Sequence, residues 1–450
     1  MHHHHPPPST TRTTHPTPTP TPNPNPNPNP NPNPTLSTST ITILATTIFS
    51  LLLVLSFTFT SSPSPHPPYH QPHPSLFPHR LLFHHSNPTN PNDQNTLLDL
   101  PTPPIIAYLI TGSKEDTSRI IRLLFAVYHP RNQYLIHLDR KASQYERDNL
   151  ALYVESVPLF KAAQNVNSIG KADFVYPIGS SGLSATLHGA SILLRVNDHW
   201  DWFINLSAAD YPLVTQDDLL HILSYMPKDL NFVNHSSYIG WRESRKLKPI
   251  VVDPGLFLEE EDEVFYATQK RELPDAYRLF SGSSCTILSR KFIEFCIMGT
   301  DNLPRTLLMY LSNSPSAASV YFPTILCNSR KFNKTTINRN MWYASFNSRQ
   351  EARPLNSSDF NDLVMSGAAF ATPFEANDPI LDQIDRELLH HEHNKPVPGG
   401  WCLGDNVTDK CTLWGDAEVL RPGPGSKRLE KSFVQIFTND TFRSSQCIYE

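Results

Sequence analysis

The chain has 450 residues, 18% of them charged, and a formal net charge of −5 at pH 7. Twenty-two of its 43 prolines fall within the first hundred residues, so that part lacks the backbone donors and apolar side chains of a folded core. The other roughly 350 residues are enough for one large domain or two small ones. Because acidic residues outnumber basic ones, the charge balance disfavours a nucleic-acid partner.

The first hundred residues divide into three segments by composition. Residues 1–40 hold a Thr-Pro run and six Asn-Pro pairs, which predict a disordered tail. Residues 41–59 are uncharged and would form a helix about 28 Å long, close to the thickness of a bilayer core. A buried core helix is the alternative, but the proline-rich flanks offer nothing to pack against. We therefore expect a transmembrane signal anchor, a cytosolic tail before it, and a Pro-rich stem over 60–100.

Cysteines and glycosylation sequons lie only beyond the apolar run. The cysteines are Cys285, Cys296, Cys327, Cys402, Cys411 and Cys447. The candidate glycosylation sites are Asn234, Asn333, Asn356, Asn406 and Asn439. A sixth sequon, Asn205, falls inside an apolar strand and is expected to stay unmodified. Both features are typical of a lumenal domain in the secretory pathway. The cysteines allow fifteen pairings, and we cannot choose among them from the sequence. Cys402 and Cys411 are close enough for a local bridge, which is a guess. The spacing of the cysteines is not that of a metal site.

From residue 105 onward, strand and helix patterns alternate along the chain. Strands are predicted at Ile105–Ile110, Gln133–Leu138 and Trp202–Leu206, and helices at Thr117–Tyr128, Ser184–Val196 and Asp217–Tyr225. This alternation predicts an α/β domain over 101–390, with a mostly parallel central sheet flanked by helices. Residues 391–450 read as a Gly- and Pro-rich, Cys-containing extension of the same domain.

Ligands of such sheets bind at the carboxyl ends of the strands. The turns of interest are therefore Thr111–Ser113, Asp139 and Ala208–Asp210. The chain contains no P-loop, no Gly-x-Gly-x-x-Gly after the first strand, and no Asp-x-Asp. Paired carboxylates of the last kind hold the divalent ion that neutralises a leaving diphosphate, so here Lys or Arg would have to do so. No metal cofactor is expected.

Polar and aromatic residues gather between positions 202 and 255. Asp210 closes a buried strand and would point toward the cleft, although a helix-capping or turn aspartate is an equally simple interpretation. Trp241 and Arg242 offer an aromatic face beside a charge for sugar stacking, or else a packing Trp in an exposed loop. Asp253-Pro254-Gly255 is most simply a turn.

Several strings in order over 105–450 resemble glycosyltransferase family 14, and in particular its plant β-glucuronosyltransferase branch, which acts on arabinogalactan proteins. They include IIAYLITGSKEDTSRIIRLLFAVYHPRNQYLIHLD, DWFINLSAADYPLVTQDDLL, VVDPGLFL and DNLPRTLLMY. More distant relatives are core-2/I-branching N-acetylglucosaminyltransferases and peptide O-xylosyltransferases. The resemblance implies a GT-A-like fold, a single-pass type II Golgi membrane protein, and inverting transfer from a UDP-sugar to a glycoprotein glycan without a metal. It also allows assembly with other Golgi transferases.

The resemblance also assigns residues by position. Thr111, Gly112, Ser113 and Asp139 would hold the uridine end of the donor. Gly179, Ser180, Ser181 and Asp210 would border the donor sugar. Trp241, Arg242, Gly282 and Ser283 would line the donor and acceptor cleft.

Two departures from the family pattern affect charge. The family has a general-base Glu in a Ser-Pro-Glu-Gly-Tyr-Phe string, and that position falls on Ser319 here, with no Asp or Glu between residues 302 and 350. The family's Ala-Arg-Lys-Phe supplies cations to the diphosphate, whereas this chain has Thr372 and Pro373. Two hypotheses stay open: an active transferase of glucuronate, N-acetylglucosamine or xylose, and a weak or non-catalytic glycan-binding or partner subunit. A glycoside hydrolase would need a facing carboxylate pair that we do not find.

Overall fold

The computed structural model describes residues 102–236, 239, 245, 247–261, 263–348, 351–404, 411–438 and 447. The expected tail, anchor and stem lie outside the described residues, as do Trp241, Arg242, Asn406 and Asn439. Among the helices that are described, none is long and apolar enough to cross a membrane.

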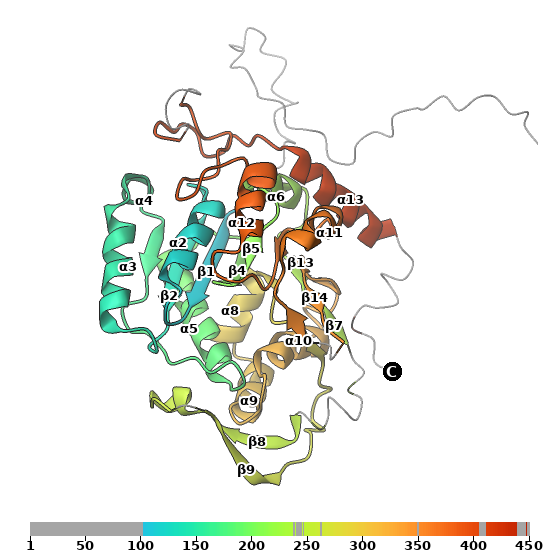
Figure 1. Ribbon diagram of the computed structural model, residues 1–450. Coiled ribbons are helices and arrows are strands. Elements are labelled where there is room, and N and C mark those ends of the chain that lie inside the picture. Colours follow the sequence, from blue (N-terminus) through green and yellow to red (C-terminus); the bar gives the residue numbers. More distant parts are fainter. Residues whose placement is uncertain are drawn as a thin grey trace, which may run out of the picture. The chain divides into compact units, whose positions relative to one another are not determined.

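A seven-stranded sheet forms the centre of the described domain (Figure 1). Its strands are β1 (Ile106–Gly112), β2 (Gln133–Leu138), β3 (Val166–Ser168), β4 (Trp202–Ser207), β6 (Asn231–Phe232), β11 (Ile287–Ser289) and β12 (Thr336–Ile337). They lie in the order β12-β6-β11-β4-β1-β2-β3. Within this sheet β11 is antiparallel to both of its neighbours, and the other pairs are parallel. The predicted α/β domain with a mostly parallel sheet is confirmed.

The helices follow the strands as the alternation predicted. They are α2 (Thr117–Ala126), α3 (Gln144–Ser156), α4 (Pro158–Ala163), α5 (Ser181–Val196), α6 (Gln216–Ser224), α8 (Arg290–Met298), α9 (Asn302–Leu311), α10 (Ala318–Asn328), α11 (Phe360–Met365), α12 (Pro379–Ile384) and α13 (Pro424–Thr438), with short helical turns η2 (Pro254–Phe257), η3 (Ser357–Asp359) and η4 (Asp385–Leu389). The predicted strands and helices are each found within three residues of the expected bounds. The largest difference is α5, which begins at Ser181 rather than Ser184.

Alternate residues of β1 point into two separate apolar cores. Tyr108 and Ile110 pack with α2, α6, α12 and α13 on one face of the sheet. Ala107 and Leu109 pack with α5, α8, α9 and α10 on the other. Helix α5 lies so close to the sheet that a Cβ at Gly189 would be 2.7 Å from a Leu109 methyl group. A sheet buried on both faces explains why its strands are continuous apolar runs rather than alternating ones.

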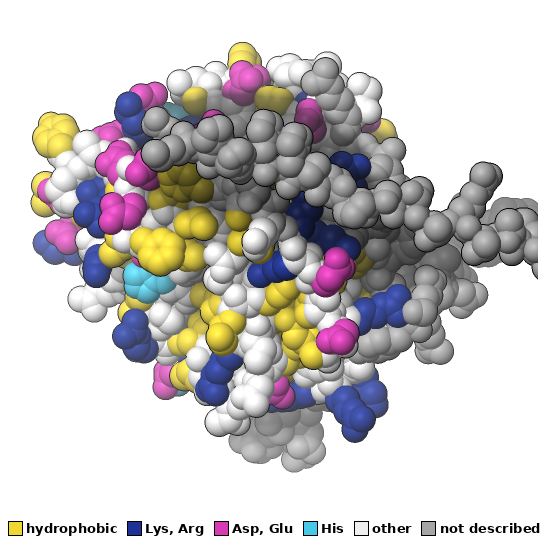
Figure 2. All heavy atoms as spheres, turned by 90° about the horizontal axis from the view of Figure 1, so that it is seen from below, with side chains coloured by type: hydrophobic (Ala, Val, Ile, Leu, Met, Phe, Trp, Pro, Cys, Tyr) yellow, Lys and Arg dark blue, Asp and Glu magenta, His cyan; other side chains and the backbone are white. Residues whose placement is uncertain are grey.

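One small three-stranded sheet and three strand pairs accompany the central sheet. The three-stranded sheet has the order β13 (Trp342–Tyr343), β16 (Phe370–Ala371), β5 (Tyr211–Pro212). The pairs are β7 (His235–Ser236) with β10 (Ser281–Gly282), β8 (Pro249–Val252) with β9 (Phe265–Lys270), and β14 (Ser345–Phe346) with β15 (Ala352–Arg353). The β8–β9 pair extends from the body of the domain at the bottom of Figure 1, and Phe265 and Tyr266 on it are exposed. Seen from that side, apolar side chains lie among charges of both signs (Figure 2).

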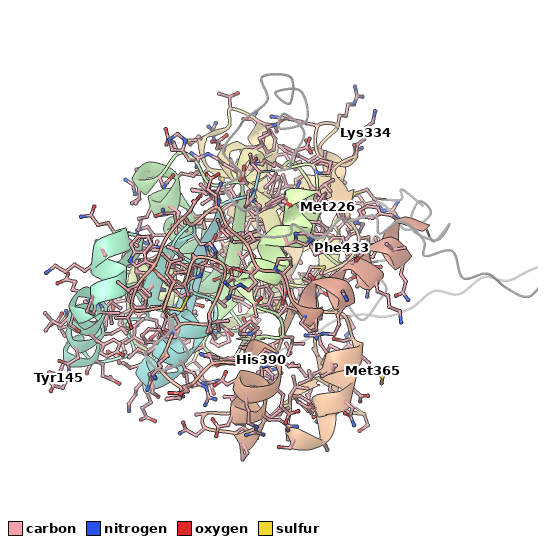
Figure 3. All side chains as sticks on the ribbon, turned by 90° about the horizontal axis from the view of Figure 1, so that it is seen from above. Tyr145, Met226, Lys334, Met365, His390 and Phe433 are labelled. Atoms are coloured by element: carbon pink, nitrogen blue, oxygen red, sulfur yellow. A yellow bond between two sulfur atoms is a disulfide. The ribbon has the colours of Figure 1, made fainter. Side chains whose placement is uncertain are left out.

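The C-terminal region contributes to the core more than its composition predicted. Helix α13 lies within the segment that we expected to be a Gly- and Pro-rich tail, so that description of 391–450 misses a helix. Its Leu429, Phe433 and Ile436 are buried in the core that α6 shares. Phe433 and Met226, which follows α6, lie close together in the view from above (Figure 3).

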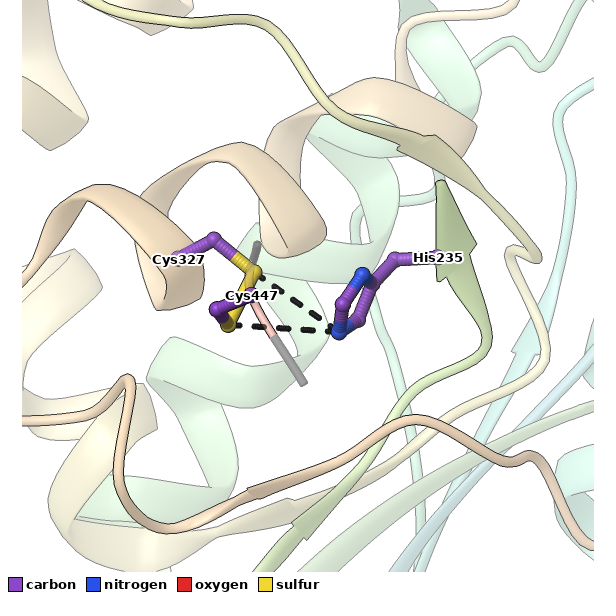
Figure 4. Close-up of side chains that lie close together, drawn as sticks. All are labelled: His235, Cys327 and Cys447. Carbon is purple, nitrogen blue, oxygen red and sulfur yellow. Dashed lines mark hydrogen bonds between the residues drawn. A yellow bond between two sulfur atoms is a disulfide. The ribbon is translucent and has the colours of Figure 1, made fainter. Parts of the chain in front are cut away.

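Two disulfides involve the C-terminal region, one closing a short loop and one joining the region to α10. Cys402 pairs with Cys411, as guessed, and Cys327 on α10 pairs with Cys447. His235 lies beside the second bridge, with its Nε2 atom 3.7 Å and 3.9 Å from the two sulfur atoms (Figure 4). Burial lowers the pKa of His235 to about 4. The three side chains have the spacing of metal ligands, but a metal needs thiolates, and the disulfide consumes both of them.

Candidate donor-binding site

The carboxyl ends of β1, β2 and β4 open into one cavity of about 290 Å³. The strand ends contribute Thr111, Gly112, Ser113, His137, Asp139, Lys141, Ser207, Ala208 and Ala209, and the helix α2 region and the loop before α5 contribute Asp116, Arg119, Val175 and Pro177. All four residues that the resemblance assigns to the uridine end are therefore brought together around one cavity. Their meeting follows from the parallel strands, whose carboxyl ends share one edge of the sheet.

Hydrogen bonds between neighbouring strand ends hold this edge together. The Ala208 amide donates to the Thr111 carbonyl at 2.7 Å, and the Asp139 amide donates to the Gly112 carbonyl at 2.9 Å. The Asp139 carboxylate accepts from the Ser113 hydroxyl and the Lys141 amide, both at 3.0 Å. Asp139 is only 2% exposed, and burial raises the pKa of its carboxyl. It is an acceptor fixed from two sides, suited to receive an N–H or O–H from a nucleoside.

Asp210 lies beside a second, smaller cavity of about 40 Å³. Arg119 and Ala208 line both cavities. The Ser207 amide donates to Asp210 at 2.6 Å, and the Thr372 side chain also bonds to it. Burial outweighs these bonds and raises the pKa of Asp210 to about 6. The Asp210 carboxylate therefore lies at the end of β4 that faces the cleft, as predicted. It is also a turn aspartate, as in the simpler interpretation, because its bond to Ser207 closes the turn.

The raised pKa of Asp210 predicts how stability depends on pH. Between about pH 4 and pH 6 the unfolded chain has lost this proton while the folded chain keeps it, so stability falls as pH rises. Asp210→Asn should remove that decline, worth roughly 1–3 kcal/mol between pH 4 and pH 7. Thermal unfolding of wild type and variant at both pH values measures the difference. A stability gap that does not change with pH would contradict the assignment.

Asp253 holds the glycine-serine loop that precedes α5. Its Oδ2 atom accepts from the Ser181 amide at 2.7 Å, and its Oδ1 atom accepts from the Gly255 amide at 2.9 Å. A Cβ at Gly179 would overlap that Oδ2 atom, so only glycine allows this approach. The interpretation of Asp253-Pro254-Gly255 as a simple turn is therefore incomplete: the carboxylate is 1% exposed and caps two helical starts.

The segment carrying the family's base position is attached to the same loop. The Ser180 hydroxyl donates to the Ser312 carbonyl at 2.7 Å, and the Ser316 amide donates to the Ile178 carbonyl at 2.8 Å. Ser319 lies in the first turn of α10, where its hydroxyl donates to the Ser316 carbonyl at 2.8 Å. The bonds at Ile178 and Ser180 thus attach the connection between α9 and α10 to the loop that follows Pro177 in the cavity wall. Residues 179–181 and Ser319 nevertheless line neither of the two cavities described here.

Gly282 and Ser283, which the resemblance assigns to the cleft, also line neither cavity. The Ser283 hydroxyl accepts from the Cys285 amide at 3.0 Å. The pKa of the Cys285 thiol is raised to about 12, mainly by burial and secondly by the negative charge of Asp210. That electrostatic coupling relates the 282–285 segment to Asp210, and the protonated thiol is a poor nucleophile.

The candidate glycosylation sites differ in exposure. Asn234 and Asn356 are exposed, and Asn333 is half-buried. Asn205 lies on β4, where its amide donates to the Thr186 hydroxyl at 3.3 Å.

Sequence reasoning missed several residues of the large cavity, notably Asp116, Arg119, His137 and Lys141. Lys141 could have been found from the sequence, because it follows Asp139 by two positions at a strand end. Arg119 could not, because in the sequence it is simply one polar position of an amphipathic helix. Its guanidinium bonds to the loop after β16, where the Phe374 amide in turn donates to the Ala209 carbonyl at 2.9 Å. Thr372 and Pro373, where the family has cations, therefore lie next to the end of β4.

The chain is similar to a known family and to several known proteins. The family model for the Core-2/I-branching enzymes matches residues 106–363. Beta-glucuronosyltransferase GlcAT14A of Arabidopsis thaliana is 48% identical over 352 residues, which cover 77% of this chain and 79% of that protein. GlcAT14C of the same plant is 45% identical over 348 residues, covering 77% and 86%.

More distant proteins match smaller shares. Xylosyltransferase 1 of Rattus norvegicus is 27% identical over 330 residues, which cover 69% of this chain and 38% of that protein. The crystal structure of mouse Xyloside xylosyltransferase 1 in its apo form aligns with 49% of this chain and 81% of that chain at 9% identity. The TM-score of this alignment is 0.24.

Proposed function

Because the chain belongs to the Core-2/I-branching enzyme family of glycosyltransferases, we propose that it transfers glucuronic acid from a UDP-linked donor to glycans of arabinogalactan proteins. One observation carries the proposal: the ends of β1, β2 and β4 surround a cavity lined by Thr111–Ser113 and Asp139. The choice of glucuronate rests on the relatives that are 45–48% identical. A GT-A-like arrangement of the donor half is part of the same proposal.

The proposed reaction is an inverting displacement. The acceptor hydroxyl forms a bond to C1 of the sugar as the bond from C1 to the diphosphate breaks, and UDP leaves with the electron pair. The hydroxyl proton must pass to a base, and the diphosphate must be stabilised as it leaves. Asp139 and Ser113 orient the nucleoside, while Asp253 holds the loop at Gly179–Ser181 on the side where α10 begins.

Turnover tests the donor. The full-length chain should release UDP from UDP-glucuronate in the presence of a β-galactan acceptor, faster than from UDP-N-acetylglucosamine or UDP-xylose. Asp139→Asn keeps the size of the side chain and removes its charge, so it serves as the donor-site control and should reduce turnover with every donor. A preference for UDP-N-acetylglucosamine or UDP-xylose would contradict glucuronate as the donor sugar and identify the preferred sugar instead.

We further propose that the donor binds without a metal, since the chain has no Asp-x-Asp. UDP affinity measured by calorimetry should be the same with and without EDTA. A loss of tenfold or more, about 1.4 kcal/mol, would contradict metal-free binding.

A second candidate function is a glycan-binding or partner subunit with weak or no turnover. Two observations favour it: Ser319 at the base position, and neutral Thr372 and Pro373 at the positions of the family's cations. Such a protein would bind UDP or a galactan and leave every UDP-sugar intact. Measuring binding beside turnover separates the two candidates.

We also propose that the protein is a single-pass type II protein of the Golgi membrane, with its catalytic domain in the lumen and able to assemble with other transferases there. The apolar run 41–59 and the sequons beyond it support this topology. Glycosidase digestion of microsomal protein should reduce its mass. An unchanged mass, with release of the protein by carbonate, would contradict the topology.

A further inference from the structure

A UDP donor brings two negatively charged phosphates that the cavity must accommodate. The family positions that carry Arg and Lys are Thr372 and Pro373 in this chain, and neither side chain carries a positive charge. A cation from another element would therefore be needed at the end of β4. The inference below rests on the proposed function, because it assumes a nucleoside diphosphate donor.

Three cations line the two cavities in the described part of the chain. Arg122 is committed to two carboxylates, the buried one of Asp385 at 2.6 Å and the exposed one of Asp382 at 2.7 Å. Lys141 lies near Asp139, with its ammonium 3.9 Å from the centre of the Tyr176 ring, at the end expected to hold uridine. Arg119 is the cation that lines both cavities, between the end of β1 and the end of β4.

Arg119 is also held against the loop that lacks the family's cations. Its Nη2 atom donates to the Phe374 carbonyl at 2.8 Å, one residue beyond Pro373. Its Nη1 atom donates to Asp116 at 2.9 Å, and Asp116 is itself fixed by the Ser113 amide at 2.9 Å. A guanidinium has five N–H groups, and these two contacts use two of them. The side chain is thus positioned in advance and retains donors for a ligand.

We propose that Arg119 is the residue that binds the diphosphate of the nucleotide donor, replacing the cations missing at Thr372 and Pro373. The replacement comes from α2, a different element from the loop that carries the family's pair. Arg119 also lies beside Asp210 at the smaller cavity, so the diphosphate would lie along Arg119 and Ala208, the two residues that line both cavities. The neighbouring Asp116 reduces the local positive charge, which predicts weaker nucleotide binding than a pair of free cations would give.

Calorimetric titration of the full-length chain with UDP, UMP and uridine tests this assignment. Arg119→Ala should weaken UDP binding by about 10- to 100-fold and leave uridine binding unchanged, because charge-assisted hydrogen bonds to the phosphates are lost. Arg119→Lys should recover part of the UDP affinity. The UDP affinity of Arg119→Ala should also depend less on salt than that of wild type. Lys161→Ala, an exposed cation on α4, is the matched charge control and should behave as wild type.

Each other outcome overturns a stated part of the proposal. An equal loss of UDP and uridine affinity in Arg119→Ala would mean that Arg119 only shapes the cavity, and the assignment would be wrong. Unchanged UDP affinity would equally overturn it, while turnover of UDP-glucuronate by wild type would leave the proposed function standing. A wild type that binds neither UDP nor uridine would overturn the proposed function and this assignment with it. Unfolding midpoints of all variants distinguish a lost contact from a lost fold.

Discussion

Arg122→Met is expected to lower the free energy of unfolding by about 3–5 kcal/mol, because it leaves a buried carboxylate without its cation. The Arg122 side chain is 8% exposed and bonds to Asp385 at 2.6 Å. Asp385 also accepts from the Tyr211 hydroxyl at 2.6 Å and faces His391 Nε2 at 2.9 Å. Methionine is apolar and similar in length to arginine. The loss of unfolding free energy therefore measures the effect of removing the charge and not that of opening a large cavity. Denaturant unfolding of the full-length chain followed by tryptophan fluorescence measures it.

Two controls separate burial from charge alone. Lys248→Met breaks the exposed pair with Glu272 and should cost only about 0–1 kcal/mol. Arg122→Met combined with Asp385→Asn should cost less than the sum of the two single substitutions, because the uncompensated charge is gone. A loss below about 1 kcal/mol for Arg122→Met alone would contradict a stabilising role for the buried pair.

The same network predicts acid sensitivity. Burial alone would raise the pKa of Asp385, but the bonds from His391 and Tyr211 and the charge of Arg122 bring it below its usual value. The stability that this carboxylate contributes is present above the unfolded pKa of about 3.9 and is lost as pH falls through the lower folded value. In Arg122→Met this loss below about pH 4 should be smaller than in wild type.

Local patterns predicted the part of the site that strands build. Gln133–Leu138 is a short apolar run with a carboxylate directly after it, and a parallel sheet then places Asp139 beside Thr111–Ser113. No distant contact is needed for that inference, because the strand ends share one edge. The same reasoning located Asp210 and the start of α5 within a few residues.

The remaining part of the site depends on residues far apart in the sequence. Asp253 bonds to Ser181 across 72 positions, and Arg122 bonds to Asp385 across 263. Neither pairing leaves a periodic pattern, since each is chosen by how helices and loops pack. Arg119 is hidden for the same reason, as its partner Phe374 lies 255 positions away.

Ser319→Glu is expected to raise kcat by about 10²–10⁴-fold with little change in the affinity for UDP. A carboxylate at this position would accept the proton of the acceptor hydroxyl as the new glycosidic bond forms, and that proton moves only in the transition state. Ser319 is half-buried in the first turn of α10, and the Ser316 amide before it bonds to Ile178 beside the donor loop. The native hydroxyl donates to the Ser316 carbonyl, so it is neither charged nor directed by a base among its described contacts.

Ser319→Gln is the matched control, because it has the shape of glutamate and cannot act as a base. Initial rates with UDP-glucuronate and a β-galactan acceptor, beside UDP titrations, give kcat and donor affinity separately. Equal rates for the Glu and Gln variants would show that this turn of α10 does not reach the acceptor hydroxyl. A wild type that already transfers sugar at ordinary rates, about 1–10³ s⁻¹, would mean that another group supplies the base. The family's base position would then not be the one that Ser319 occupies.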